Sequence, residues 1–425
     1  MSTKSHQELS TIAAETPQAP EKLAMVRYQT LANTVSLRYA NVDMQAFLAV
    51  LCVASAHGYR EEGAVWLFIA GPASSGKTSL GIDPHVWCHE HYLLSHISTH
   101  TLLSGMDDKT KSAAESPASL LFQVGDSVLF LMPDFSSILG MRPYDRAEMA
   151  SQFRQLYDGF QKRNVGRKGK ALHWQGKATL IAAVTGEAEY QWGLQSDLGD
   201  RFLTIRWPRQ ASRAVGRRSA EQIGEEAQVK AAIAKATGDF VAIETLEHLA
   251  EASEQDMDRA HSLALVMAFA RATVKRAGRQ GAICREPEQE STPRTSKALL
   301  QVARQSADLF RHQQITESDM GIAERIALDS IPTTRRRVIE RLPSNGDGLT
   351  IAEISELTGY HESTARFVVE ELTALRVTAP TSSKGSTGHI PLTVEFRDAI
   401  EAAGLTLNSR WPGDRQPEDF KPLSS

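Results

Sequence analysis

The sequence feature that most constrains the fold is the run GPASSGKT, from Gly71 to Thr78. It matches the pattern G-x-x-x-x-G-K-[ST] at every fixed position. The run before it, AVWLFIA from Ala64, is continuously apolar and is typical of a strand buried within a parallel sheet. A loop of this kind between a strand and a helix directs backbone N–H groups toward a phosphate group. The sequence therefore predicts a strand, a phosphate-binding loop and a helix, in that order.

Two side chains of this loop are expected to have separate roles toward a nucleoside triphosphate. Lys77 would reach the β- and γ-phosphates, and the hydroxyl of Thr78 would bind Mg²⁺. The expected cofactors are ATP and Mg²⁺, and the expected binding residues are Gly71, Pro72, Ala73, Ser74, Ser75, Gly76, Lys77, Thr78 and Ser79. Gly81 and Pro84 follow closely, so the helix should be short or kinked. The alternative is a glycine-rich turn without a ligand.

Further apolar runs predict more strands of the same sheet: SVLFLM from Ser127, ATLIAAVT from Ala178 and RFLTIRW from Arg201. Helical stretches separate them, notably EMASQFRQLYDGF from Glu148. Alternating strands and helices predict an α/β domain with a parallel sheet. From Phe240 onward the pattern changes to helices only, with a helix cap expected at Thr316.

Composition limits the class of protein. The chain has 425 residues, which suggests two or three domains, and its 41% hydrophobic and 23% charged residues are typical of a globular protein. The net charge is -4, which excludes a globally basic, histone-like protein. Any contact with nucleic acid must therefore come from local basic patches.

Cysteine usage and apolar runs indicate the compartment. The three cysteines, Cys52, Cys88 and Cys284, form no CxxC pair, so neither a disulfide framework nor a zinc ribbon is expected. Residues 1–22 lack the apolar stretch of a signal peptide, and the longest apolar run, from Phe47, is about half a membrane span. We expect a cytoplasmic protein with no membrane segment. Histidines and a cysteine also gather between residues 85 and 100, but their spacings match no standard zinc pattern. We expect these residues to have a packing role: His85, Cys88, His89, His91, His96 and His100.

Near the C-terminus the sequence predicts a small separate unit. Thr350 and Glu353 form a capping-box pattern, Gly359 ends the first helix, and a second apolar-periodic helix follows. VTAPTSSKGSTGHIPLTVEF then predicts two short strands around a Gly/Ser-rich turn. Two helices, a tight turn and a hairpin predict a winged helix-turn-helix.

One acidic residue is expected to complete the nucleotide site. VLFLMPDF puts Asp134 at the C-terminal end of a strand, where ligands bind in open α/β sheets. Asp134 would bind Mg²⁺ or activate water, and a turn aspartate is the alternative. Its neighbours, Pro133 and Phe135, supply no second acid, so hydrolysis is expected to be slow.

These motifs, taken in order, resemble those of AAA+ ATPases. The similarity rests on Gly71–Thr78, the strand that ends in MPDF, the strand that ends at Thr185, LGDRF from Leu198, and PRTSKALLQVARQSADLF from Pro293. It is closest to helicases of the minichromosome-maintenance (MCM) type, including compact forms carried by mobile elements. The resemblance implies an α/β fold with an AAA+ P-loop parallel sheet and an α-helical lid, followed by the winged helix-turn-helix.

The resemblance also implies roles for three residues. Thr185 looks like the sensor-1 residue beside the γ-phosphate, Arg201 resembles the arginine finger that reaches a neighbouring subunit's nucleotide, and Arg294 resembles sensor 2, acting in cis or trans. Where the family has adjacent Asp-Glu acids, this chain has Pro133-Asp134, so Asp134 takes the catalytic Glu position and the usual metal-binding Asp is missing. Arg201 could instead pair with Asp200.

These patterns divide the chain into an expected series of segments. They are a flexible tail (1–22), N-terminal helices (23–60), the P-loop core (61–210), a helical lid (211–330), a basic linker (331–347), the winged helix (348–397) and a second tail (398–425). The linker arginines could hold a nucleic-acid backbone or only keep the linker solvated.

Two places are expected to contact DNA. The first is an acid-free hairpin from Lys162 to Lys177 with glycines at Gly166 and Gly169; it lies between the acidic motif and sensor 1, where MCM helicases place a pore hairpin with a lysine. The second is the winged helix, although Glu370 and Glu371 reduce its positive charge. The expected contact residues are Lys162, Arg163, Arg167, Lys168, Lys170, Ser363, Arg366 and Lys384. A solvated surface loop and a protein-binding winged helix are the respective alternatives.

The expected function is therefore that of a Mg²⁺-ATP-dependent motor acting on DNA, resembling a replicative helicase of a mobile element. The expected assembly is a homo-oligomeric ring, plausibly a hexamer, with possible partners among replication proteins. One alternative is an ATP-switched DNA-binding initiator, helicase loader or regulator with little turnover. A second is an ATP-dependent remodeller of protein partners.

Overall fold

The computed structural model describes a large part of the chain. The described residues are 19–40, 42–58, 63–84, 90–95, 97–103, 119–165, 170–185, 201–208, 213–221, 223–242, 250–277, 281–344, 346–380 and 388–406. The side chains of 19, 164, 165, 170, 171 and 219 are outside this description. No helix among these residues is long and apolar enough to span a membrane.

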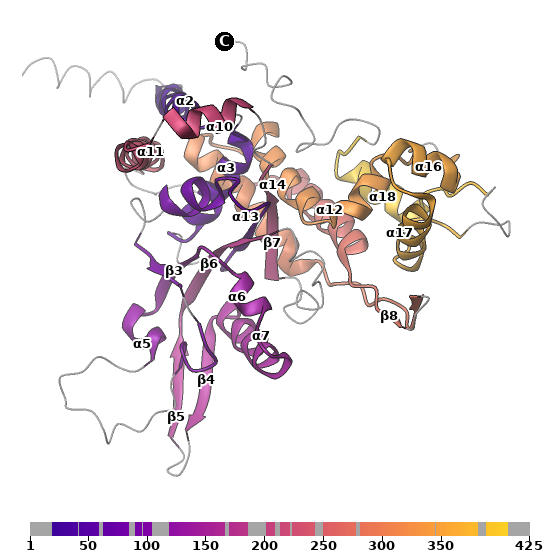
Figure 1. The fold of residues 1–425 in the computed structure, drawn as a ribbon, viewed down its shortest axis with the longest axis horizontal. Coiled ribbons are helices and arrows are strands. Elements are labelled where there is room, and N and C mark those ends of the chain that lie inside the picture. The colour runs from indigo at the N-terminus through magenta and orange to yellow at the C-terminus, as the bar shows by residue number, and fades with distance from the viewer. Residues whose placement is uncertain are drawn as a thin grey trace, which may run out of the picture.

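The centre of the protein is a five-stranded parallel sheet in the order β2-β3-β6-β1-β7 (Figure 1). The strands are β1 (Trp66–Ala70), β2 (Tyr92–Leu93), β3 (Ser127–Met132), β6 (Lys177–Val184) and β7 (Phe202–Arg206). The long strands are nearly continuous apolar runs because helices cover both faces of the sheet. The four strands predicted from sequence are confirmed, and β2 is an additional short edge strand.

The two faces of the sheet carry separate apolar clusters. Leu67 and Ile69 point to the face covered by α3 (Met44–Ala56), and Trp66 and Phe68 point to the opposite face. On that second face, α7 (Pro143–Tyr157) covers an aromatic cluster in which the rings of Phe68 and Phe202 stack with centroids 3.8 Å apart. Because side chains of β1 point alternately to the two faces, the helices on both faces pack against this one strand.

The remaining helices form the layers and the helical region after the sheet. They are α2 (Ala19–Arg38), α5 (Leu120–Val124), α6 (Ser136–Leu139), α10 (Arg213–Glu221), α11 (Glu226–Val241), α12 (Glu254–Arg271), α13 (Pro293–Phe310) and α14 (Glu317–Asp329). α2 packs on α11 and α13. The cap predicted at Thr316 is confirmed, since its hydroxyl accepts a hydrogen bond from the Asp319 N–H and the Asp319 carboxylate accepts one from the Thr316 N–H.

Two antiparallel hairpins project from this body. β4 (Phe160–Val165) pairs with β5 (Lys170–Gln175), which confirms the predicted hairpin, although its turn at 166–169 lies outside the described residues. The two strands extend from the end of the sheet that lies away from α2 and α10 (Figure 1). The second hairpin joins β8 (Arg276–Ala277) to β9 (Ala282–Ile283).

The C-terminal helices lie together beside the sheet domain (Figure 1). They are α15 (Thr333–Ile339), α16 (Ile351–Thr358), α17 (Glu362–Ala374) and α18 (Val394–Ala402). α16 ends at Gly359, whose φ of 69° is left-handed, and α17 follows at once. Single antiparallel bridges join Leu349 to Ile390 and Thr378 to Leu392, so the strand pairing around the two helices is short.

The segment expected to be a basic linker, 331–347, differs from that expectation because it contains α15 and buries two of its arginines. Arg335 donates hydrogen bonds to the carbonyls of Ala270 and Ala272 and pairs with Glu371. Arg336 pairs with Asp329 and Glu340. These two cations therefore join α15 to its neighbours and are not available to a nucleic-acid backbone. The tail expected from 398 likewise begins inside α18.

Candidate functional site

The expected phosphate loop lies where β1 ends, at the carboxyl edge of the sheet, which is the edge formed by the C-terminal ends of the parallel strands. β1 lies between β6 and β7, so the loop is flanked by the ends of both strands. The Gly71 N–H donates to the Val184 carbonyl at 3.2 Å, and the Trp207 N–H donates to the Ala70 carbonyl at 2.6 Å. This is the edge at which open α/β sheets bind ligands.

The loop's backbone has the local geometry that turns N–H groups inward. A Cβ atom at Gly71 would lie 2.7 Å from the Trp207 carbonyl oxygen, so only glycine allows this close approach. Ser74 and Gly76 have positive φ values of 58° and 89°, while Ser75 between them does not. Backbone of alternating handedness forms a concave group of N–H donors that favours an anion.

The surroundings of two polar side chains of the loop, Lys77 and Ser75, also favour an anionic ligand. Lys77 is largely buried, and its Nζ donates to the carbonyls of Gly71 and Pro72 at 2.6 and 2.5 Å. Burial lowers the pKa of Lys77 from its ordinary value, and the carboxylate of Asp134 acts in the opposite direction. Among the described residues, the Ser75 hydroxyl is buried without a hydrogen-bond partner. A phosphate group would supply acceptors for both side chains.

Residues 85–89 lie outside the described residues, so a short or kinked helix after the loop stays a prediction. The segment directly after the loop is a π-helix, η1 (Lys77–Ile82). It leaves Thr78 exposed at the carboxyl edge. Asp134 is also exposed there, just beyond β3, and its Oδ1 accepts a hydrogen bond from the Ser136 N–H at 2.8 Å. Thr185 follows β6, which lies between β3 and β1. Lys77, Thr78, Asp134 and Thr185 thus share one edge of the sheet.

This edge could hold Mg²⁺ through the Thr78 hydroxyl and the Asp134 carboxylate, which are oxygen donors of the kind that ion prefers. Asp134 is fixed by its hydrogen bond to the Ser136 N–H, and the Phe135 N–H donates to the Ala183 carbonyl at 2.9 Å. Within the described ranges, no cluster of three or more His, Cys, Asp or Glu side chains is arranged to hold a metal ion. A metal here would therefore be held mainly by its bound phosphates and water.

Arg201 and Arg294 lie together at the opposite, amino edge of the sheet, where the strands begin. The Arg201 Nη2 is 2.9 Å from Asp158 Oδ2, and the Arg294 Nη2 is 3.6 Å from Asp158 Oδ1. Both guanidinium groups lie over the ring of Tyr157, at 5.8 and 5.6 Å from its centroid. Arg201 therefore pairs with a distant carboxylate, and the sequence neighbour considered as its partner, Asp200, lies outside the described residues.

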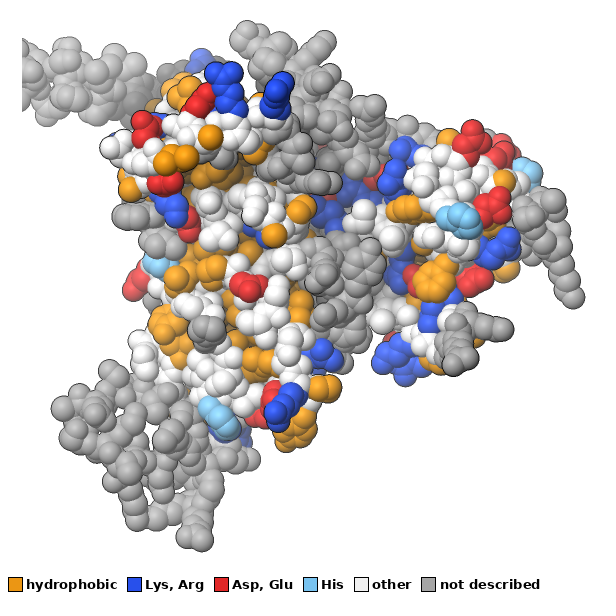
Figure 2. Space-filling view, in the orientation of Figure 1, with side chains coloured by type: hydrophobic (Ala, Val, Ile, Leu, Met, Phe, Trp, Pro, Cys, Tyr) orange, Lys and Arg blue, Asp and Glu red, His pale blue; other side chains and the backbone are white. Residues whose placement is uncertain are grey.

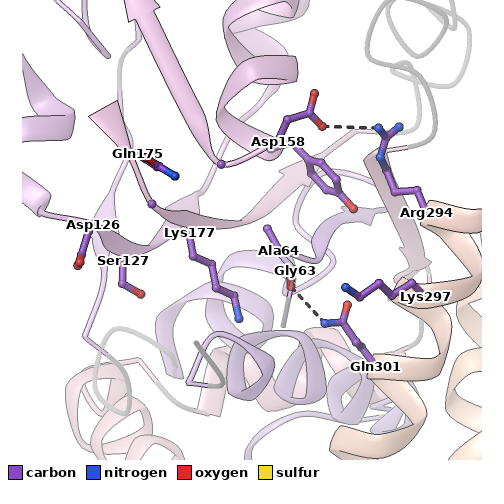
Figure 3. A pocket seen from close by; sticks show the side chains of 13 residues that line it. Gly63, Ala64, Asp126, Ser127, Asp158, Gln175, Lys177, Arg294, Lys297 and Gln301 are labelled. Atoms are coloured by element: carbon purple, nitrogen blue, oxygen red, sulfur yellow. Dashed lines mark hydrogen bonds and ion pairs between the residues drawn. The ribbon is translucent and has the colours of Figure 1, made fainter. Parts of the chain in front are cut away.

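A cavity of about 710 Å³ opens at this amino edge (Figure 3). Its lining includes Asp126, Asp158, Lys177, Arg294, Lys297 and Gln301. Figure 3 shows that Arg294, Lys297 and Gln301 come from one helix and face the strand ends across the cavity. Gln301 Nε2 donates to the Gly63 carbonyl at 3.3 Å, and Lys177 Nζ donates to the Ala56 carbonyl at 2.8 Å. The cavity is therefore lined by cations and carboxylates, and two of its side chains are held by backbone carbonyls.

The two edges are too far apart for one copy to complete a single site. Phe202, the residue after Arg201, pairs with Trp66 at the start of β1, whereas Gly71 follows the end of β1. Because a strand advances about 3.3 Å per residue, Arg201 and the phosphate loop are separated by roughly 20 Å along the sheet. An arginine side chain does not reach that far. Arg201 and Arg294 cannot contact a phosphate held by Lys77 of the same copy.

The cations of the basic hairpin differ in exposure and in their contacts. Lys162 on β4 is exposed. Arg163 donates to the carbonyls of Thr99 and Leu103 and to His100 Nδ1, at 2.9, 2.6 and 2.8 Å, so it fastens the hairpin to residues 97–103. Arg167 and Lys168, and the side chain of Lys170, lie outside the described residues.

On α17, Ser363 and Arg366 are exposed, as expected for contact residues, while Lys384 lies outside the described residues. The second half of α17 is covered by the β8–β9 hairpin. Arg276 stacks on Phe367 at 3.5 Å from the ring centroid and pairs with Glu370 and Glu371 at 3.1 and 3.2 Å. The two glutamates expected to reduce the positive charge of this unit are thus ion-pair partners of Arg276.

Figure 2 shows charged side chains of both signs on the C-terminal helices and on the helices around α2 and α10, with a mostly uncharged surface over the sheet. On this face, the described residues form no extended patch of one sign, in keeping with the net charge of -4.

Three features of the site were missed by reasoning from sequence: Trp207 under the loop, the Asp158 and Tyr157 partners of the arginines, and the amino-edge cavity. Trp207 is the last residue of the predicted strand RFLTIRW and directly follows β7, which is the one signal that could have indicated it. The partners of the arginines depend on contacts distant in sequence and carry no local signal. A comparison with protein-family models and a search of the curated proteins give no match to this chain.

Proposed function

We propose that this chain is a Mg²⁺-ATP-dependent ATPase of the AAA+ type that acts on DNA as a ring of identical copies. One observation carries the proposal: the phosphate loop and the Arg201–Arg294 pair lie at opposite edges of one sheet. Each copy then holds two incomplete halves of a site. Head-to-tail contact of identical copies joins such halves and, where the rotation closes, generates a ring.

The residues of the carboxyl edge would bind the triphosphate. The loop N–H groups and Lys77 would hold the β- and γ-phosphates, and Thr185 would contact the γ-phosphate from the end of β6. When bound, Mg²⁺ would neutralise phosphate charge and is expected to be held through Thr78 and Asp134. Of the described carboxylates, Asp134 is the one that would orient the attacking water.

The arginines of the neighbouring copy would complete this site. Charge develops on the phosphate oxygens as the γ-phosphoryl group is transferred, and a guanidinium group placed there contributes about 10³–10⁵-fold to the rate in related enzymes. Asp158 and Tyr157 hold Arg201 and Arg294 side by side in the single chain, ready to face one anion.

DNA would be contacted chiefly through Lys162 and the rest of the β4–β5 hairpin, without sequence readout. The hairpin begins two residues after Asp158, so the DNA-contacting element and the arginine pair share one edge of the sheet. A change in nucleotide state at the interface could therefore move the hairpin. Ser363 and Arg366 on α17, within the proposed winged helix, would add a second contact.

The deciding experiment measures ATP turnover by the full chain with and without single-stranded DNA at low salt, together with particle size. We expect DNA to stimulate turnover and Mg²⁺-ATP to favour the assembled form. A protein that remains a monomer and hydrolyses no ATP under both conditions would contradict the proposal.

A second candidate function is an ATP-switched DNA-binding protein with little turnover. It is favoured by the isolation of Asp134 between Pro133 and the buried Phe135, which leaves no second acid beside it. Strand displacement separates the two candidates: a motor displaces a strand with continued hydrolysis, whereas a switch binds DNA in the ATP state and displaces nothing.

A further inference from the structure

A buried arginine outside the proposed site connects the two segments that carry Arg201 and Arg294. Arg271 ends α12 and is 4% exposed. Its Nη1 donates to the carbonyl of Phe202, the residue after Arg201, at 2.9 Å. Its Nε and Nη2 both donate to Glu290 Oε2, at 2.8 and 2.6 Å, and Glu290 lies just before the start of α13, where Arg294 is found.

The hydrogen bonds of Arg271 restrict the movement of the segments that it joins. A guanidinium group that makes several charge-assisted hydrogen bonds fixes both orientation and distance because its donors form a rigid plane. A buried charge is also tolerated only while it is paired, so the Glu290 contact cannot be lost without cost. Arg271 therefore ties the first residue of β7 to the segment that leads into α13.

The two guanidinium groups that this tie holds near each other carry the same charge. Asp158 lies between them and offsets their repulsion, with one oxygen toward each. Asp158 alone does not fix the backbones of the two arginines, which belong to β7 and α13. Of the contacts described above, those of Arg271 fix these two backbone segments relative to each other.

We propose that Arg271 is a positioning residue for catalysis across the copy-to-copy interface: with Glu290 it sets the separation of Arg201 and Arg294, so that the pair receives the γ-phosphate held by the phosphate loop of a second copy of this chain. This proposal rests on the proposed ATPase function. Arg271 itself touches no nucleotide, because it is buried behind the start of β7. Its effect is on orientation, and misplacement of a catalytic group by about 1 Å can lower a rate roughly a hundredfold.

The same helix offers a matched control. Arg259 on α12 is also partly buried, pairs with Glu317 and Glu324 at 2.6 and 3.4 Å, and donates to the Ala403 carbonyl at 3.1 Å. Its contacts reach α14 and the end of α18 and neither of the two arginines. Arg259→Met therefore removes a comparable set of hydrogen bonds without disturbing the pair.

The test compares Arg271→Met, Arg271→Lys and Arg259→Met in the full, assembled chain. We expect Arg271→Met to lower kcat about a hundredfold while KM and ATP binding change less than about threefold, because the phosphate loop is intact. Arg271→Lys, which keeps the charge, should recover part of the loss. Arg259→Met should lower the unfolding temperature less than Arg271→Met does, because its partner Glu317 is exposed, and should leave kcat within about threefold of the wild type.

Mixing of variants separates positioning from damage to the fold. Lys77→Ala copies lack the loop lysine but keep an intact arginine pair, and Arg271→Met copies have the reverse defect. Random mixing in equal amounts puts an intact loop opposite an intact pair at about one interface in four, so the mixture should turn over ATP faster than either variant alone.

Two results would overturn the proposal: wild-type kcat in Arg271→Met, or a loss of kcat in Arg271→Met that Lys77→Ala copies do not relieve. The failure of the proposed function looks different. In that case Lys77→Ala alone would bind and hydrolyse ATP as the wild type does, whatever the behaviour of the Arg271 variants.

Discussion

The two edges of the central sheet differ in the groups that they offer to an anion: mainly backbone groups at one edge and side chains at the other. At the carboxyl edge the backbone does most of the work: a glycine that lies against Trp207, alternating φ values, and N–H groups directed into a loop. At the amino edge the side chains dominate, with two arginines held by Asp158 and Tyr157 beside a cavity of about 710 Å³. One edge is suited to hold an anion, and the other is suited to approach one.

This difference has a consequence for assembly. A backbone loop can bind phosphate without a partner, whereas each arginine of the pair is held in the single chain by a contact with the Asp158 carboxylate. An anion brought by another copy would compete for the same guanidinium groups. The comparison therefore predicts that substitutions at the carboxyl edge affect nucleotide binding, and that substitutions at the amino edge affect turnover in the assembly.

The largest effect is expected for Lys77→Ala at the carboxyl edge. Removing the cation of the phosphate loop should weaken ATP binding by about 2–5 kcal/mol and abolish turnover, because a bound phosphate would lose a charged partner in a partly buried site. Isothermal calorimetry with ATP measures the binding. An unchanged affinity of Lys77→Ala for ATP would contradict the interpretation of Gly71–Thr78 as a phosphate loop.

Next in size is the effect of Arg201→Ala at the amino edge. Turnover should fall by about 10³–10⁵-fold, while each chain still binds ATP with nearly wild-type affinity. The measurement is the steady-state rate of Arg201→Ala alone and mixed with Asp134→Ala copies. The mixture should regain activity because one variant keeps the loop side and the other keeps the arginine. Absence of any recovery would mean that Arg201 acts within its own copy or only supports the fold.

The sequence was a good guide to the carboxyl edge. Apolar runs identified β1, β3, β6 and β7, and the positions of Lys77 and Asp134 followed from the strands that precede them. Local patterns suffice there because the loop and its strand are adjacent in the chain. β2 escaped prediction because two residues, Tyr92 and Leu93, are too few to show a pattern.

The amino edge could be predicted less well, because its contacts join distant segments. Asp158 binds arginines from the start of β7 and the start of α13, and no local spacing reveals such partners. The same limitation explains Arg163, Arg335 and Arg336, which were interpreted as surface cations. Each of them instead has carbonyl or carboxylate partners in other parts of the structure.

A smaller effect is expected at the β4–β5 hairpin, where two adjacent cations should differ. Lys162→Ala removes an exposed charge, so it should reduce the salt dependence of single-stranded DNA binding by about one unit of slope and leave stability unchanged. Arg163→Ala leaves two carbonyls and His100 without their donor and should destabilise the fold by about 1–3 kcal/mol. DNA titrations at several salt concentrations and thermal unfolding measure the two effects. If both variants changed DNA binding and stability to the same extent, Lys162 and Arg163 would not have the separate roles of DNA contact and structural support.

The smallest effect concerns a site remote from the phosphate loop and the arginine pair, and it serves as their reference. His312 Nδ1 lies 2.7 Å from the carboxylate of the buried Asp319 at the cap of α14, and this hydrogen bond raises the pKa of His312 above its ordinary value of 6.5. A raised pKa in the folded state means that the protonated histidine stabilises the fold below pH 6.5 and that this contribution is lost as the pH rises through the folded-state value.

Stability should therefore fall by less than about 1 kcal/mol as the pH rises through that range, since the histidine is partly exposed. The measurement is thermal unfolding on both sides of the range for the wild type and for His312→Gln, in which the extra pH dependence should disappear. ATP affinity and the recovery of activity in mixed copies should be the same for both proteins. If His312→Gln altered either of them, the separation of the two edges from the rest of the helical region would fail, and turnover losses at Arg201 could no longer be assigned to the amino edge alone.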